Sequence, residues 1–125
     1  MDKKPRIAIV DDDRSAREGL VDLVSAMGFD AQAFERAADF LQAHQIGHAD
    51  CLITDVRMPG MNGLELLDRL HTSGRSVPAI VLTAFTHESD RVRALGAGAV
   101  CYMTKPVHEN ELMRCISTAL SRGNK

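Results

Sequence analysis

The sequence contains few aromatic residues, few cysteines and no long hydrophobic run. Its 125 residues include no tryptophan, one tyrosine and three cysteines, and no two cysteines form a Cys-x-x-Cys pair. No apolar stretch approaches the roughly 20 residues that a membrane-spanning helix requires. The first residues also lack the apolar core of a signal peptide. These absences predict a cytoplasmic protein without membrane contacts.

Neither sign of charge dominates the sequence. Fifteen basic and seventeen acidic residues give a net charge of −2, so the chain has no general attraction for nucleic acid, and we expect no direct nucleic-acid contact from it. A hydrophobic content of 45% with 26% charged residues is typical of a folded globular protein. A chain of 125 residues suits one domain with one core, so we expect a single domain over residues 1–125.

The cysteines and two of the histidines are candidates for metal or redox sites. Cys51 and Cys101 fall in apolar segments and Cys115 falls in a helical pattern, which predicts three buried, reduced thiols without a metal or redox role. His44 and His48 have the spacing of a helical metal pair. Because Gly47 separates them and no third ligand is evident, surface histidines are expected instead.

Apolar segments of strand length alternate with segments of helical period along the whole chain. Strands are expected at 7–10, 30–34, 51–54, 79–82 and 100–104, and helices at about 16–27, 37–43, 62–73, 87–95 and 109–121. An aspartate of the 11–13 run and Asn62 are expected to cap the helices that follow them. Strict alternation predicts a parallel sheet with helices on both faces.

Polar side chains stand where four of these strands end. Asp11 and Asp12 follow the first strand, Asp55 follows the third, Thr83 follows the fourth and Lys105 follows the fifth. The carboxyl ends of parallel strands meet at one edge of a sheet, which is where open sheets bind their ligands. We therefore expect the other four side chains to converge around Asp55.

This set of residues accounts for one reaction. Three neighbouring carboxylates repel one another, and a Mg²⁺ ion bound by oxygen ligands relieves the repulsion. Asp55 is then expected to attack a phosphoryl group and form an acyl phosphate, with Lys105 and Thr83 contacting the phosphoryl oxygens. Each residue has an alternative role as a helix cap or an ion-pair partner, but chance does not readily place all of them at strand ends.

Four motifs resemble those of bacterial two-component response-regulator receiver domains. They are Val10-Asp11-Asp12, the run from Asp55 to Gly63, Leu82-Thr83-Ala84 and Lys105-Pro106. Residues 58–67 are similar to receivers of the nitrogen-fixation regulator type. The resemblance covers essentially the whole chain. It implies a flavodoxin-like α/β fold, with a five-stranded parallel sheet of order 2-1-3-4-5 and five helices on its two faces.

The resemblance also implies a role for each site residue. Asp55 would be the phosphoacceptor and Lys105 the cation that pairs with the phosphate, before a cis Pro106. The switch residues would be Thr83 and Tyr102. The alternative for Tyr102 is a purely structural role, as an aromatic side chain that is half-buried in the strand with its hydroxyl exposed to water. The Mg²⁺ site would comprise Asp11, Asp12, Asp55 and the carbonyl of Arg57.

The expected function is that of a phosphorelay signalling module. A sensor histidine kinase would supply the phosphoryl group, and residues 84–95 with the last helix would form the surface for a homodimer or an effector. The chain would not be an enzyme apart from self-catalysed phosphoryl transfer and autodephosphorylation, and transcription control would need an output domain absent from it.

Two alternative functions remain. One is a phosphatase of the haloacid-dehalogenase type that uses Asp11-Asp12-Asp13, although the chain has no room for the cap domain of such an enzyme. The other is a receiver-like interaction module that is not phosphorylated.

Overall fold

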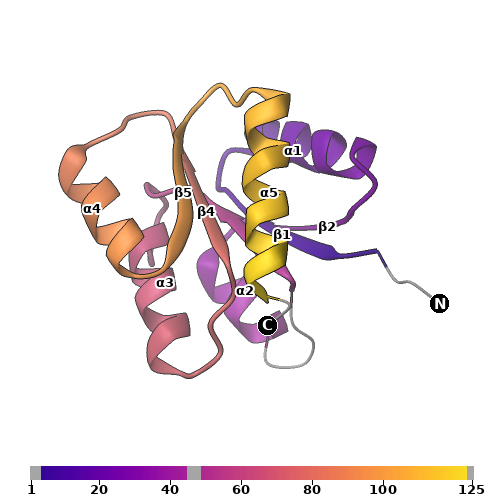
Figure 1. Cartoon of the computed structure of the whole chain (residues 1–125). Coiled ribbons are helices and arrows are strands. Elements are labelled where there is room, and N and C mark those ends of the chain that lie inside the picture. Colours follow the sequence, from indigo (N-terminus) through magenta and orange to yellow (C-terminus); the bar gives the residue numbers. More distant parts are fainter. Residues whose placement is uncertain (1–3, 45–48, 124–125) are drawn as a thin grey trace.

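A computed structural model describes residues 4–44 and 49–123, in which five strands alternate with five helices (Figure 1). In chain order these are β1 (Arg6–Val10), α1 (Arg14–Ala26), β2 (Asp30–Phe34), α2 (Ala37–His44), β3 (Cys51–Thr54), α3 (Gly63–Thr72), β4 (Ala79–Thr83), α4 (Glu88–Gly96), β5 (Ala99–Thr104) and α5 (Glu109–Gly123). All the expected elements are present, and α5 continues beyond its expected end at Ser121.

The strands form one parallel sheet in the order β2-β1-β3-β4-β5, which confirms the predicted topology. Successive side chains of a strand point to opposite faces, so the sheet has two cores. Ile7, Ile9 and Ile53 pack under α1 and α5, whereas Ala8 and Leu52 pack under α2, α3 and α4. Helices therefore cover both faces, as predicted (Figure 1).

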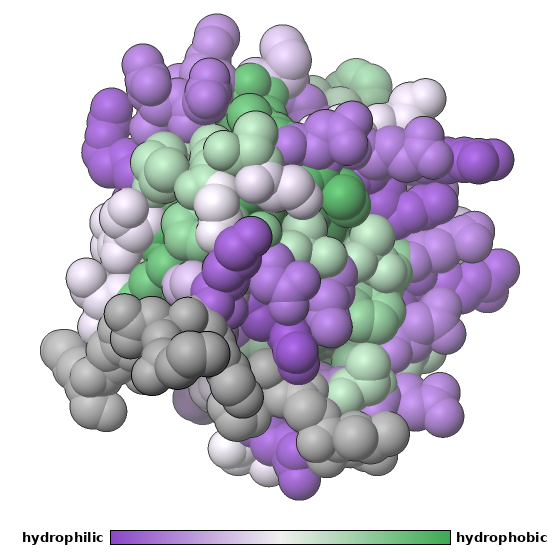
Figure 2. All heavy atoms as spheres, turned by 90° about the vertical axis from the view of Figure 1, so that its right-hand side faces the viewer, coloured by the Kyte–Doolittle hydropathy of each residue, from purple (hydrophilic) through white to green (hydrophobic). Residues whose placement is uncertain are grey.

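The central strands are the buried ones. Every residue of β3 and β4 is buried, as is all of β1 beyond Arg6, while the edge strand β2 contains only exposed and partly buried residues. Figure 2 shows the side turned to the right in Figure 1, where hydrophobic side chains reach the surface in small groups between hydrophilic ones. No helix within the described ranges is long and apolar enough to cross a membrane.

The predicted helix caps are present next to the strand ends. The Asp13 side chain accepts hydrogen bonds from the backbone N–H groups of Ser15 and Ala16, at 3.0 and 3.4 Å. Asn62 and Glu65 form a reciprocal capping box at the start of α3. Because Asp13 is the cap of α1, the side chains of the two preceding aspartates are not needed there.

Gly63 fixes the path of the chain after β3. Its N–H donates to the Val56 carbonyl at 3.0 Å, which closes the loop that follows Asp55. A Cβ at this position would overlap the Asp55 carbonyl oxygen and lie 2.9 Å from the Asp55 carbonyl carbon. Only glycine lets the start of α3 approach the backbone of Asp55 so closely.

The expectation of a surface histidine at position 44 is wrong. His44 is buried, its ring stacks on Phe40 with the centroids 5.1 Å apart, and its Nε2 lies 3.2 Å from the Arg75 carbonyl oxygen. His44 stands four residues after Phe40, so both lie on the face of α2 that packs on the sheet. His48 lies outside the described residues.

The expectation of three reduced thiols is wrong for two of the cysteines. Cys51 is a free, buried thiol as predicted, and burial raises its pKa to about 12. Cys101 and Cys115 form a disulfide that joins β5 to α5. Cys101 belongs to the set of β5 side chains that face α5, and Cys115 faces β5 from the helix. The two cysteines therefore meet although 14 residues separate them.

Candidate functional site

Three strand ends meet around the ammonium group of Lys105. Its Nζ donates to Asp11 Oδ2 at 2.7 Å and to Asp55 Oδ2 at 2.8 Å. The three residues follow β5, β1 and β3, and the carboxyl ends of these parallel strands lie at the same edge of the sheet, so the fold brings the residues together. The structure thus places Asp11, Asp55 and Lys105 in direct contact at the carboxyl edge of the sheet.

The cluster is largely shielded from solvent and carries net negative charge. Asp11 and Asp55 are only 1% and 9% exposed, and both share the Lys105 ammonium. Burial alone lowers the pKa of Lys105, but the hydrogen bonds to Asp11 and Asp55 outweigh it and raise that pKa above its usual value. Lys105 therefore stays charged, and two carboxylates against one ammonium leave an excess negative charge that a cation would balance.

The two carboxylate oxygens of Asp55 have different partners. Oδ1 accepts hydrogen bonds from the backbone N–H groups of Val56, at 2.6 Å, and Arg57, at 3.3 Å. Oδ2 accepts from Lys105. These donors fix the orientation of the carboxylate at the carboxyl end of β3.

Asp12 is the predicted site residue that stands apart. Its side chain is exposed, and no hydrogen bond or ion pair joins it to the other site residues within the described part of the chain. No three His, Cys, Asp or Glu side chains among the described residues are grouped as a ready-made metal site. The donors are nevertheless carboxylate and carbonyl oxygens, which suit Mg²⁺, an ion that binds through one or two carboxylates and keeps several waters.

Thr83 lies beside Lys105 at the end of β4. It is buried, and its carbonyl oxygen accepts a hydrogen bond from the Lys105 N–H at 2.9 Å. The peptide bond between Lys105 and Pro106 is cis, as predicted. The backbones of Thr83 and Lys105, which carry the predicted switch hydroxyl and the predicted phosphate-pairing cation, are thus hydrogen-bonded to each other at the ends of β4 and β5.

Two groups from this end of the sheet contact the start of α4. The Tyr102 hydroxyl accepts a hydrogen bond from the His87 N–H at 3.2 Å, and Arg57 pairs with Asp90 at 2.9 Å. Asp90 is the residue that sequence reasoning missed. Nothing in its spacing indicates the contact, because its partner Arg57 lies 33 residues away in the loop after β3.

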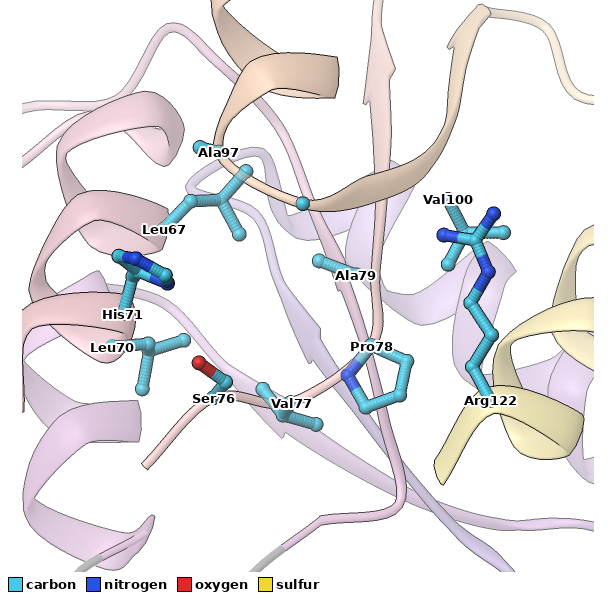
Figure 3. Close-up of a pocket in the computed structure, with 11 residues that line it drawn as sticks. Leu67, Leu70, His71, Ser76, Val77, Pro78, Ala79, Ala97, Val100 and Arg122 are labelled. Atoms are coloured by element: carbon cyan, nitrogen blue, oxygen red, sulfur yellow. The ribbon is translucent and has the colours of Figure 1, made fainter. Parts of the chain in front are cut away.

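Two hollows lie at opposite ends of the sheet. An apolar hollow of about 450 Å³ opens next to Lys105, between α1 and the β5–α5 connection, and Gly19 and Leu23 are among its lining residues. A second cavity of about 330 Å³ lies at the amino end of β4, between Leu67 and His71 of α3 and Arg122 of α5 (Figure 3). Of these two hollows, the first adjoins the cluster around Asp55, because Lys105 is among its lining residues.

Comparison with known proteins agrees with this geometry. The family model of the response regulator receiver domain matches residues 7–117. The response regulator protein TodT of Pseudomonas putida is 38% identical over 119 residues, which make up 95% of this chain and 52% of TodT. The transcriptional regulatory protein FixJ of Bradyrhizobium diazoefficiens is 33% identical over 120 residues, covering 96% of this chain and 58% of FixJ. The chain thus spans about half the length of these curated relatives.

Solved structures show the same architecture. The low-resolution structure of the response regulator StyR matches with a TM-score of 0.89 and 37% identity, covering 98% of this chain and 62% of that one. The crystal structure of FixJ-N matches with a TM-score of 0.88 and 31% identity, covering 96% of each chain. Both the sequence match and the sheet with its Asp–Lys cluster lead to the same conclusion: the chain belongs to the family of response regulator receiver domains.

Proposed function

We propose that residues 1–125 form a receiver domain that accepts a phosphoryl group on Asp55 from a sensor histidine kinase. The observation that carries this proposal is the position of Asp55, almost buried at a strand end with one oxygen held by Lys105 and the other by backbone N–H groups. Phosphorylation by sensor kinases is the general mode of action of response regulators, the family to which the chain belongs.

The chain's own groups suit the transfer step. An Asp55 carboxylate oxygen attacks the phosphorus atom, and the bond between phosphorus and the donor's histidine nitrogen breaks. Lys105 and the backbone N–H groups of Val56 and Arg57 stabilise the phosphoryl oxygens, and Thr83 supplies a hydroxyl. Mg²⁺ held by Asp11, Asp12, Asp55 and the Arg57 carbonyl would neutralise further phosphoryl charge. Beyond this self-catalysed transfer and the later hydrolysis, we propose no enzymatic activity.

The element that responds is proposed to be α4. Ala94 is its buried residue, and the helix is otherwise held by polar contacts: Arg57 with Asp90, Arg93 with Asp68, and His87 with Tyr102. A segment with few apolar contacts opens at low free-energy cost. α4 is therefore less firmly held than α1 or α5, both of which bury apolar side chains in the core.

Arg57 couples the site to this helix. Its backbone N–H donates to Asp55, and its guanidinium pairs with Asp90 on α4. A phosphoryl group on Asp55 adds negative charge that competes with Asp90 for the guanidinium. Movement of the Thr83 hydroxyl toward the phosphoryl group would open space into which Tyr102 can turn. This turn would break the hydrogen bond between the Tyr102 hydroxyl and the His87 N–H at the start of α4.

Movement of α4 would change an apolar surface. Phe85, Val92 and Leu95 are 73%, 58% and 40% exposed and lie on or just before α4, at the left in Figure 1. Exposed apolar groups of this kind suit a homodimer or an effector contact. FixJ is a transcriptional regulatory protein, and we propose that this receiver also acts in the cytoplasm through an output domain of a longer protein, without touching nucleic acid itself.

Asp90→Asn tests the Arg57 contact. In the unphosphorylated protein this variant is expected to speed hydrogen exchange of the α4 amides roughly two- to fivefold, because a partly exposed ion pair contributes about 0.5–1 kcal/mol. Hydrogen exchange followed by mass spectrometry measures this. Glu88→Gln is the matched control, since Glu88 is also in the first turn but pairs with Arg91 inside the same helix. Equal acceleration in both variants would show that the contact with Arg57 does not restrain α4.

A further inference from the structure

The Cys101–Cys115 disulfide crosses from the edge strand of the sheet to the helix packed against it. The Cα atoms of the two cysteines are 6.3 Å apart, which is within the range that a disulfide spans without backbone movement. β5 and α5 lie next to each other in Figure 1, and their order in the chain leaves only the connection 105–108 between them. The geometry therefore permits the bond without disturbing the fold.

Solvent reaches this pair but not the third cysteine. Cys101 and Cys115 are both partly exposed, whereas Cys51 is fully buried in β3. The Met103 thioether lies 3.6 Å from the Cys115 sulfur and fills the space beside the pair. A thiol reagent in solution therefore distinguishes the two sets: it can reach Cys101 and Cys115 in the reduced protein while Cys51 stays protected.

The bond acts on the strand that leads into the phosphoacceptor site. Cys101 faces α5, its neighbour Tyr102 faces the α4 side of the sheet, and the strand continues to Lys105. α5 is anchored by Leu112, which is fully buried. A covalent bond between Cys101 and Cys115 thus ties the strand that bears Tyr102 to a firmly packed helix.

We propose that Cys101 and Cys115 form a reversible dithiol–disulfide modification site that responds to low-molecular-weight disulfides. One cysteine thiolate attacks a sulfur of the small disulfide, and the other small thiol leaves and takes up a proton. The second cysteine thiolate then attacks the mixed disulfide and expels the second small thiol. Two protein thiols are oxidised and one small disulfide is reduced to two thiols. In a cytoplasmic protein, disulfides that form are usually transient or redox-sensing.

Oxidation is expected to have two effects. Closing a short loop between β5 and α5 restricts the unfolded chain, so the oxidised protein melts at a higher temperature. The bond also restrains β5 beside Tyr102, so it is expected to reduce the movement of β5 that phosphorylation causes. The second effect rests on the proposed function, whereas the first does not depend on it.

The site is tested by equilibrating the folded full chain with mixtures of reduced and oxidised glutathione, trapping free thiols and measuring the intact mass. The oxidised chain is expected to lose two reactive thiols, to yield one cross-linked peptide containing Cys101 and Cys115, and to regain both thiols in excess reduced glutathione. The melting temperature is expected to rise by roughly 10 °C on oxidation. Cys101→Ser should abolish this rise, while Cys51→Ala should retain it even if its overall stability is lower.

Three results would overturn the proposal: thiols that stay reduced in excess oxidised glutathione, mixed glutathione adducts without a cross-link, or a rise in melting temperature that persists in Cys101→Ser.

The link to phosphorylation is measured separately, as the change in β5 hydrogen exchange caused by acetyl phosphate and Mg²⁺. A smaller change in the oxidised than in the reduced form supports it, and equal changes refute it. A chain that takes up no phosphoryl group in either form contradicts the proposed function but leaves the thiol result standing.

Discussion

Replacing Lys105 by methionine is expected to slow phosphorylation by acetyl phosphate roughly hundredfold, the size of effect seen when one charge-stabilising donor is removed. Lys105 is the ammonium group that contacts both Asp11 and Asp55, at 2.7 and 2.8 Å. Methionine keeps an unbranched side chain of similar length but offers no charge to the transferred phosphoryl group. The rate of mass gain in the presence of Mg²⁺ measures the effect.

Measurements of folding and of Mg²⁺ binding distinguish an effect of Lys105→Met on phosphoryl transfer from an effect on the structure. The Lys105→Met variant should bind Mg²⁺ more tightly than the wild type, because the ammonium no longer competes for the same two carboxylates. Lys4→Met is the matched control, since Lys4 is exposed and lies before β1, and it should leave the rate unchanged. A Lys105→Met variant that is folded, binds Mg²⁺ and is phosphorylated at the wild-type rate would exclude Lys105 from the transfer step.

Replacing Gly63 by alanine is expected to lower the free energy of unfolding by about 2–3 kcal/mol, as overpacking against rigid atoms does. The new methyl group would overlap the carbonyl of Asp55, and neither the end of β3 nor the capped start of α3 can move away easily. Urea denaturation measures the change. Because the displaced backbone is that of Asp55, phosphorylation should slow in the same variant.

The matched control is the same substitution in another helix. Gly19 lies in the middle of α1, and a Cβ there has no heavy atom within 4 Å. Gly19→Ala is therefore expected to raise the free energy of unfolding by about 0.5–1 kcal/mol, because glycine is a poor helix former. Two alanine variants of opposite sign would tie the cost at Gly63 to its contact with Asp55. Equal effects at both positions would contradict the close approach.

Much of the sheet edge followed from sequence because its causes are local. The apolar run of β3 and the turn residues after it fix where that strand ends, and parallel pairing then brings Asp55 to the same edge as Asp11 and Lys105. The caps at Asp13 and Asn62 depend on residues two or three positions away. The strand ends and the caps require no knowledge of how distant segments pack, and the parallel order of the strands follows from their alternation with helices.

The features that sequence reasoning missed depend on packing between distant elements. The Arg57–Asp90 pair and the Tyr102–His87 hydrogen bond both require the position of α4 relative to the sheet, which a mostly polar helix does not reveal. Gly47 and the lack of a third ligand argue against a metal pair, but they say nothing of the place of His44 beside Phe40 on the buried face of α2. The Cys101–Cys115 bond depends on how α5 is turned over β5, and an odd number of cysteines pointed away from it.

The identity of the phosphoacceptor is tested most directly by the intact mass of the protein after incubation with acetyl phosphate and Mg²⁺. The wild type should gain one phosphoryl group that hydroxylamine removes, as expected of an acyl phosphate, and Asp55→Asn should gain none. Asp39→Asn, an exposed aspartate of α2, should behave as the wild type. An adduct that persists in Asp55→Asn and disappears in Asp11→Asn would contradict the assignment of Asp55 and would indicate phosphatase-type chemistry at Asp11.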